Sequence, residues 1–219
     1  MEKYDFTMQH LYGENHHHIT KILSILQASN LEEAFIRKFY ASVPMLNLTE
    51  EDYKLYANLA RNAFNFLNER SSDLSQVRIY QCDFKDIESD HTIIEIVSHE
   101  MPFLFDSAIC LLNRLNIDLD RVAHPNIFVQ RNKDGKLISI DEELSNNGQQ
   151  ELIIQIRTSH SLSEGLIKQI DAELKNILAL VEHSVGDWKN YLLKILEAGL
   201  WIEKIITLLF LPQLEQSLL

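Results

Sequence analysis

The sequence predicts an α+β protein in which a helical N-terminal segment precedes an antiparallel sheet with helices on one face. Three observations support this fold class. Apolar residues recur at spacings of three and four over residues 19–67, as on amphipathic helices. The period then changes to alternation from Val77 onward, which is typical of half-buried strands. Two further helical patterns, one from Pro102 and one from Ser161, lie between or after the strand segments.

The first seventy residues contain three helical patterns. Ile19 to Leu26 and Glu32 to Val43 each place their apolar residues on one face, and Pro44 is expected to end the second helix. Thr49, followed by three acidic residues, is typical of a helix start because its hydroxyl can cap the first free N–H groups. The third helix is expected to run to about Arg70. Residues 1–70 are therefore predicted to form a helical segment.

The strands follow. His91 to Val97 is apolar on nearly both faces, which suits a central strand. The Asp-Gly pair in Asn132-Lys133-Asp134-Gly135 predicts a hairpin, since that turn needs positive φ angles. The other predicted strands are Val77–Tyr80, Asn126–Gln130, Leu137–Ile140 and Glu151–Arg157.

Two helices complete this region. Pro102 is expected in the first turn of a helix that ends near Asn116. Ser161-Leu162-Ser163-Glu164 resembles a capping box and predicts a helix through about Ser184. The order strand, strand, helix, hairpin, strand, helix is that of the ferredoxin-like layout. We predict this α+β domain over residues 71–185 and a C-terminal helical tail over residues 186–219.

Bulk properties exclude several function classes. The 219 residues carry a formal net charge of −12, which disfavours binding to nucleic acid. The N-terminus has no basic region before an apolar run, and the apolar stretch 192–211 contains four charged residues. We therefore expect no secretory signal, no membrane span and a cytoplasmic location. Cys82 and Cys110 each lie in an apolar segment and are expected to be buried free thiols.

No catalytic, metal or cofactor site is predicted in this chain. His16-His17-His18 cannot all face one ion on a helix, because consecutive side chains point about 100° apart. Ser107 and Ser161 lack a G-x-S-x-G context, and the chain contains no G-x-G-x-x-G.

One turn is a candidate binding site. His99, Glu100, Met101 and Asp106 lie where the central strand leads into the following helix. The free N–H groups of a helix N-terminus can hold the carboxylate of an amino-acid effector. Alternatively, Glu100 only caps this helix and Asp106 faces water.

The segment EIVSHEMPFLFDSA (Glu95 to Ala108) resembles the N-terminal region of the large bacterial NAD-specific glutamate dehydrogenases, which typically show "EIV…DMPFLVDS". The family usually has two acids before the methionine, where this chain has Ser98-His99-Glu100. The resemblance covers about residues 30–203. Its further matching motifs are Phe39-Tyr40, Val43-Pro44, Leu55-Tyr56, Val77-Arg78-Ile79-Tyr80, Leu112-Asn113-Arg114, His124-Pro125, Ile153 to Ile156 and Asp187-Trp188.

The resemblance implies an ACT-like regulatory or scaffolding part without catalysis of its own. In the family, NAD and glutamate bind far downstream in a much longer chain. The parent reaction converts L-glutamate and NAD to 2-oxoglutarate, ammonia and NADH. Expected partners are an amino-acid effector and a second copy of the chain. The alternative is a free-standing amino-acid-binding module that acts through protein partners.

The tail supports a further expectation. The family continues after Trp201-Ile202 with a segment like DNHFTFLG, where this chain has KIITLLFL. One nucleotide sequence that encodes Lys204 to Leu211 also encodes DNHFTFL when it is read in a different reading frame. We therefore expect residues 204–219 to be out of frame and the chain to be a truncated fragment. The gene's DNA tests this, since another frame must encode DNHFTFL at that point.

Overall fold

A computed structural model describes residues 15–70, 74–84, 90–141 and 148–185. The chain divides into two compact units, Met1–Leu178 and Ala179–Leu219. The domain boundaries expected at residues 70 and 185 stay predictions. The helix expected from Trp188 and the out-of-frame hypothesis for residues 204–219 lie outside the described residues.

Three helices open the described chain: residues 15–26, α2 (Asn30–Tyr40) and α3 (Glu50–Asn68). Thr49 caps α3 as predicted, in a capping box with Asp52. Helix α2 ends at Tyr40, three residues before the predicted end at Val43. The buried side-chain amide of Asn15 explains this end, because it donates to the carbonyls of Tyr40, Ala41 and Val43 at 2.8–3.2 Å.

The sheet is antiparallel throughout, with the order β1-β2-β6-β4-β5 and with β3 also paired to β6. Strand β6 therefore has β2 on one side and both β3 and β4 on the other, each paired to a different part of β6. Helix α4 (Leu104–Arg114) connects β2 to β3. This is the split β-α-β arrangement of the ferredoxin-like layout, so the predicted fold class is confirmed. The strands are β1 (Gln76–Gln81), β2 (Thr92–His99), β3 (Leu119–Ala123), β4 (Asn126–Arg131), β5 (Leu137–Asp141) and β6 (Gln149–Thr158).

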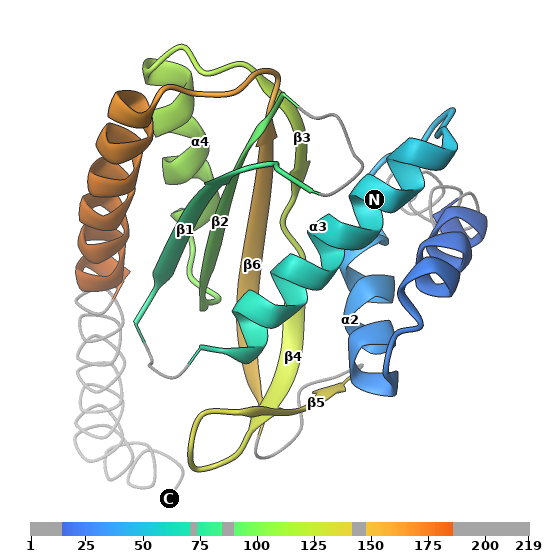
Figure 1. Ribbon diagram of the computed structural model, residues 1–219. Coiled ribbons are helices and arrows are strands. Elements are labelled where there is room, and N and C mark those ends of the chain that lie inside the picture. The colour runs from blue at the N-terminus through green and yellow to red at the C-terminus, as the bar shows by residue number, and fades with distance from the viewer. Residues whose placement is uncertain (1–14, 71–73, 85–89, 142–147, 186–219) are drawn as a thin grey trace, which may run out of the picture. The chain divides into compact units, whose positions relative to one another are not determined.

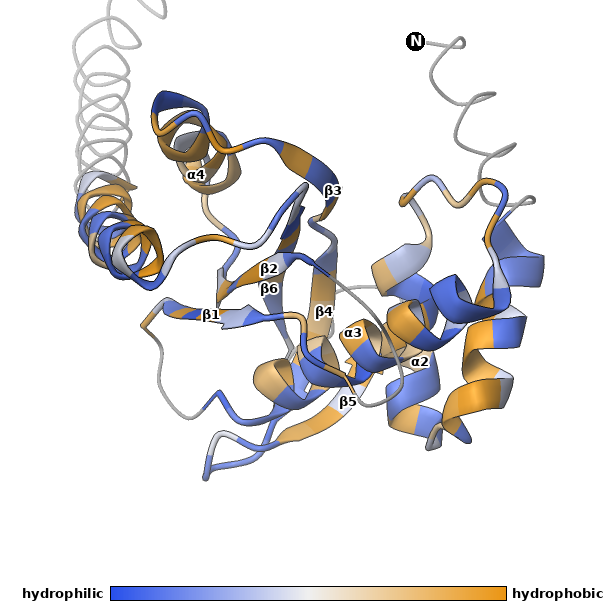
Figure 2. Ribbon diagram, turned by 45° about the horizontal axis from the view of Figure 1, so that its top comes forward, coloured by the Kyte–Doolittle hydropathy of each residue, from blue (hydrophilic) through white to orange (hydrophobic). Residues whose placement is uncertain are grey.

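Helices cover both faces of the sheet within the first unit. Helix α4 and residues 164–178 of the last described helix lie on one face, and α3 crosses the other (Figure 1). The sequence predicted the two helices on the first face. The second face is covered by the N-terminal helices. Seven of the eight β2 residues are buried, as expected of a strand covered on both faces. Figure 2 shows the hydrophobic sides of α2 and α3 facing the sheet.

Several local expectations need correction. Helix α4 starts at Leu104 rather than at Pro102, and Phe103 in the N-cap position has a left-handed φ of 68°. Strand β3 was not predicted. In the hairpin only Gly135 has a positive φ, of 80°, because a bulge after Gln130 makes the loop longer than a two-residue turn.

The last described helix begins at residue 164 and is capped by Ser163, whose hydroxyl accepts from the N–H of Leu166 at 3.4 Å. The predicted cap was Ser161, two residues earlier. Of the two cysteines, Cys82 is buried as expected, but Cys110 is exposed on α4. No described helix is long and apolar enough to cross a membrane.

Candidate functional site

The turn predicted to bind an effector runs from the end of β2 into α4. His99 is the last residue of β2 and pairs with Glu151 of β6, while Met101 is half-buried. Glu100 is exposed, and its N–H donates to the carbonyl of Gln150 at 3.1 Å. Asp106 is exposed in the first turn of α4. The four residues therefore lie along one connection, with both carboxylates at the surface.

Helix α4 has no side-chain cap at its N-terminus, because Phe103 occupies the N-cap position. Its first N–H groups therefore lack the partner that Ser, Thr, Asp or Asn supplies at most helix starts. Phe105 of the same turn stacks on His124, with ring centroids 4.0 Å apart. His124 belongs to a motif on which the family resemblance rests, whereas Phe105 stands where the family typically has valine. This contact therefore serves packing between α4 and the strand connection.

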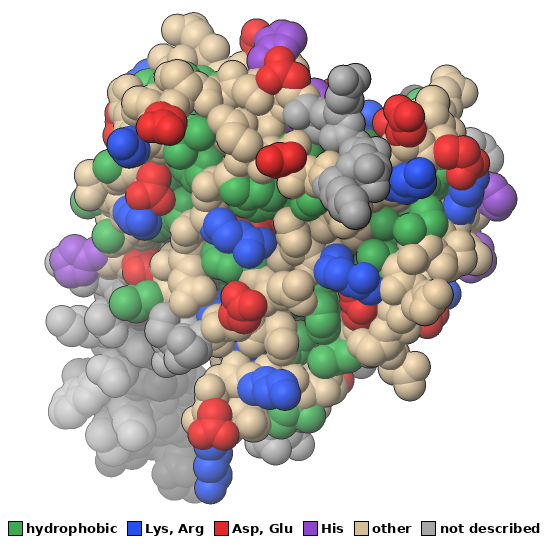
Figure 3. Space-filling model, viewed as in Figure 1, with side chains coloured by type: hydrophobic (Ala, Val, Ile, Leu, Met, Phe, Trp, Pro, Cys, Tyr) green, Lys and Arg blue, Asp and Glu red, His purple; other side chains and the backbone are tan. Residues whose placement is uncertain are grey.

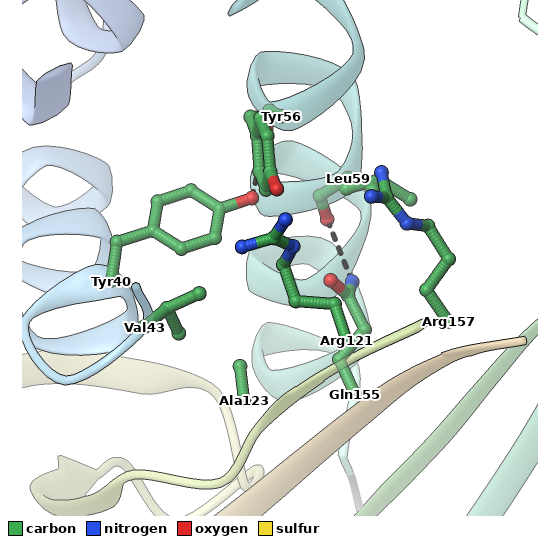
Figure 4. Close-up of a pocket in the computed structure, with 8 residues that line it drawn as sticks. All are labelled: Tyr40, Val43, Tyr56, Leu59, Arg121, Ala123, Gln155 and Arg157. Carbon is green, nitrogen blue, oxygen red and sulfur yellow. Dashed lines mark hydrogen bonds between the residues drawn. The ribbon is translucent and has the colours of Figure 1, made fainter. Parts of the chain in front are cut away.

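A second site lies on the opposite face of the sheet, where sequence reasoning placed none. It is a cavity of about 20 Å³, enough for roughly one water molecule. Side chains from α2 and α3 face side chains from β3 and β6 across it (Figure 4). The lining residues are Tyr40, Val43, Tyr56, Leu59, Arg121, Ala123, Gln155 and Arg157.

Strand register brings the two arginines of this cavity together. Arg121 of β3 is the direct cross-strand partner of Arg157 of β6. Like charges in directly opposed positions destabilise a sheet, so this pairing needs compensation. The ring of Tyr56 supplies part of it, because the two guanidinium carbons lie 5.8 and 5.5 Å from its centroid. Asp120 supplies more through an ion pair with Arg157.

The remaining polar contacts fix the walls of the cavity. The Tyr40 hydroxyl donates to the carbonyl of Tyr56 at 2.8 Å, which ties α2 to α3. The Gln155 amide donates to the carbonyl of Leu59 at 3.1 Å, which ties α3 to β6. Arg121 donates to the carbonyl of Pro44. The cavity is thus held by bonds between elements far apart in the sequence.

Three buried polar atoms of the lining residues have no hydrogen-bond partner among the described residues: Tyr56 Oη, Arg121 Nε and Arg157 Nη1. Burial raises the pKa of Tyr56 against the opposing charges of Arg157 and Arg121, so the phenol keeps its proton at neutral pH. Two guanidinium N–H groups and one phenol hydroxyl are therefore buried around this cavity without a partner among the described residues.

These residues left a weak trace in the sequence. On β6, Glu151, Ile153, Gln155 and Arg157 share one face by the two-residue period, and three of the four are polar. Polar residues on a strand face that the helices cover indicate buried hydrogen bonds or a site. The partner Arg121 could not be found in this way, because its strand was not predicted.

The same face of the sheet buries two carboxylates. Glu95 accepts from Tyr80 at 3.1 Å and from Gln155 at 2.8 Å, and it pairs with Arg78. Glu151 pairs with Arg70 at 2.8 Å and Arg131 at 2.7 Å. No group of three or more His, Cys, Asp or Glu side chains in the described chain is placed to hold a metal ion.

Comparison with known proteins identifies the family of this chain. The model of the family "Glutamate dehydrogenase, ACT1 domain" matches residues 35–174. The chain belongs to this family. The matched range contains the second half of α2, all of α3 and α4 and the whole sheet, and with them both the turn and the cavity. The resemblance on which the sequence analysis relied is therefore confirmed.

Curated relatives of this ACT1-family chain include two bacterial proteins named NAD-specific glutamate dehydrogenase. The one from Halomonas elongata is 25% identical over 160 residues, which are 71% of this chain and 10% of the relative. The one from Pseudomonas aeruginosa is 23% identical over 174 residues, which are 78% of this chain and 11% of the relative. The chain thus matches about a tenth of the length of these relatives. No solved structure matches the chain.

Proposed function

We propose that the chain is a non-catalytic regulatory or scaffolding part of an NAD-specific glutamate dehydrogenase. The observation that carries this proposal is the ACT1 match over residues 35–174. The parent reaction would be the oxidation of L-glutamate by NAD to 2-oxoglutarate and ammonia, performed by residues outside this chain. A cytoplasmic location and self-association through a sheet edge belong to the same proposal. The end strands of the sheet are β1 and β5.

The effector site of this proposal is the turn with His99, Glu100, Met101 and Asp106. An amino acid carries a carboxylate and an ammonium group. The uncapped N–H groups at the start of α4 suit the carboxylate, and the exposed side chain of Asp106 suits the ammonium group. A simple carboxylic acid would meet the same N–H groups, but it has no ammonium group to offset the repulsion from Glu100 and Asp106. The turn should therefore prefer amino acids over acids that lack an amino group.

A thermal-shift screen against a panel of amino acids tests this site. A ligand at one hundred times its dissociation constant stabilises the folded state by about 2.7 kcal/mol, a shift of several degrees. Asp106→Asn should abolish the shift, because it removes the charge that faces the ammonium group. Asp134→Asn, in the exposed hairpin loop, is the matched control and should keep the shift. If no amino acid raises the transition temperature, sensing fails and only scaffolding remains.

The absence of catalysis has its own test. Glutamate-dependent reduction of NAD by the purified chain, followed at the absorbance of NADH, should not exceed a blank without protein. Measurable turnover would overturn the assignment of the chain to a non-catalytic part.

A further inference from the structure

Three strands of the described sheet have one side without a neighbouring strand: β1, β3 and β5. Natural proteins protect such edges with helices, bulges or charged side chains, because an open edge can pair with another chain. Helix α2 packs against β5, and a bulge after Gln130 interrupts the pairing of β5 to β4. Strand β3 has a register shift after Leu119 and carries the charged residues Asp120 and Arg121. The edges at β3 and β5 are therefore protected.

Strand β1 is the outermost strand at the opposite end of the sheet (Figure 1). Its six residues pair with β2 in one unbroken register, so no bulge twists this edge away. Its one charged side chain, Arg78, forms an ion pair with the buried Glu95 of β2 and is therefore turned into the sheet. Strand β1 thus presents the most open edge of the described sheet.

The backbone of β1 shows which of its residues face outward. The N–H of Cys82, which directly follows β1 and its partner residue Gln81, donates to the carbonyl of His91 at 2.8 Å, in line with the register of β1 on β2. Residues that bond to one neighbour alternate along an antiparallel strand. Every second residue before Cys82 therefore bonds to β2, while Val77, Ile79 and Gln81 direct their N–H and carbonyl groups away from it.

These outward backbone groups form an unpaired row. The carbonyl of Gln81 accepts from the N–H of Asp83 at 2.9 Å. The N–H and carbonyl groups of Val77 and Ile79 have no backbone partner in the described part of the chain. Such a row is a template for a further strand.

The same strand of a second copy fits this row in one register. A twofold axis perpendicular to the sheet keeps each face on its own side, so a residue lies opposite its own copy or a residue an even number of positions away. With Ile79 on the axis, Ile79 lies opposite its copy and Val77 lies opposite Gln81. All three outward residues are then paired within β1.

Neighbouring registers fit less well. Moving the axis by one residue to either side leaves one outward residue opposite a position beyond the end of β1. With the axis at Arg78, this residue also lies directly opposite its copy, and opposed like charges destabilise a sheet. With the axis at Ile79, Arg78 lies opposite the aromatic side chain of Tyr80 instead. The register centred on Ile79 is therefore favoured.

We propose that β1 is the surface through which two copies of this chain pair, antiparallel and with Ile79 on the twofold axis. This inference rests on the self-association proposed above and names its edge, its partner and its register. The pairing joins the two sheets into one continuous sheet.

Disulfide trapping in the full chain tests the register. Cys110→Ser first removes the exposed thiol. In that background, Ile79→Cys should give a covalent dimer on mild oxidation, because the Cα atoms of a directly opposed, hydrogen-bonded pair lie about 5.5 Å apart, within the range of a disulfide. Val77→Cys is the matched control on the same face of the same strand. Its two copies would lie about 13 Å apart along the strands, so it should give no covalent dimer.

Ile79→Pro separates pairing from folding. The N–H of Ile79 points away from β2, so proline should leave the pairing of β1 to β2 intact while it removes one donor from each copy. Sedimentation velocity should show the dimer dissociation constant raised by roughly 5- to 100-fold. Ile79→Thr keeps the N–H and the β-branched shape, and it should retain the dimer. The disulfide comparison decides the question if Ile79→Pro does not fold.

Two results would overturn the proposal. A chain that sediments as a monomer and gives no covalent dimer with Ile79→Cys does not pair through β1, and the self-association proposed above then fails with it. Equal trapping by Ile79→Cys and Val77→Cys, or a dimer that withstands Ile79→Pro, would mean that the copies associate through another surface. Neither result bears on the amino-acid screen or the NAD assay, so the regulatory role is tested separately.

Discussion

Glu95 and Glu151 are both buried on the α3 face of the sheet, but their surroundings shift their pKa values in opposite directions. Burial raises the pKa of Glu95, and the charge of Arg78 and hydrogen bonds from its neighbours only partly offset this. Burial alone would also raise the pKa of Glu151. There, the hydrogen bond and charge of Arg131, with the charge of Arg70, outweigh burial and hold the pKa below its usual value.

Glu151→Gln is expected to destabilise the protein by about 3–5 kcal/mol at neutral pH, because it removes the buried ion pairs that Glu151 makes with Arg70 and Arg131. Glu95→Gln is the matched control and should cost less than about 2 kcal/mol, since Arg78 is about one-third exposed and keeps contact with water. Urea unfolding of both variants measures the difference. Equal losses would contradict this account of the Glu151 ion pairs.

The pH dependence of the same two groups has opposite signs. The folded-state pKa of Glu151 is lowered, so its contribution to stability is full above the unfolded value of about 4.5 and is lost as pH falls through the folded value. The folded-state pKa of Glu95 is raised, so its contribution is full below the unfolded value and is lost as pH rises through the folded value. Glu151→Gln should therefore flatten the acid limb of the urea midpoint against pH.

Among the elements, α4 begins in the least favourable way. Phe103 has a φ of 68° and is 70% exposed, so it carries the strain of the left-handed region without the gain of burial. The sequence could not show this, because Pro102 is itself an acceptable first residue of a helix. The strand before it and the packing of Leu104 decide where the helix begins, since Leu104 is fully buried.

Phe103→Gly should stabilise the protein by about 1 kcal/mol, because glycine adopts positive φ without a Cβ penalty. Phe103→Ala is the control: it removes the same ring but keeps the Cβ, so it should not stabilise. Thermal unfolding of the two variants gives the comparison. Stabilisation by alanine as large as that by glycine would show that the ring, rather than the backbone, is the source of the strain.

For the molecule as a whole, the sheet sets the order of local stabilities. Strands β2 and β6 pair with neighbours on both sides, whereas β5 pairs only with β4. On the face seen in Figure 3, acidic, basic and hydrophobic side chains are interspersed. Because β2 and β6 are paired on both sides, we expect their backbone amides to be the best protected from hydrogen exchange.

Native-state hydrogen exchange should be slowest for the amides of β2 and β6, at rates that follow global unfolding, and clearly faster in β5. NMR detection of individual amides provides the measurement. Protection of β5 equal to that of β6 would indicate that the edge strand opens only with the whole sheet.

The sequence by itself determined the type of most elements and the family. Period-two and period-3.6 patterns arise from neighbours along the chain, and so does the Thr49 cap, which is why these predictions agree with the structure. The motif around Met101 to Ser107 identified the family, and the ACT1 match confirmed it. Whether the turn it forms binds an effector stays a prediction.

Only the tertiary structure decided how residues distant in sequence meet. From the sequence alone, the N-terminal helices could have packed only against one another. They lie on the second face of the sheet because the helices and strands β2 and β6 bury their apolar residues against each other there. The cavity of Tyr56, Arg121 and Arg157 depends on the register of β3 on β6 and on the crossing of α3 above them. Such contacts are set by the packing of whole layers, which leaves no periodic signal in any single segment.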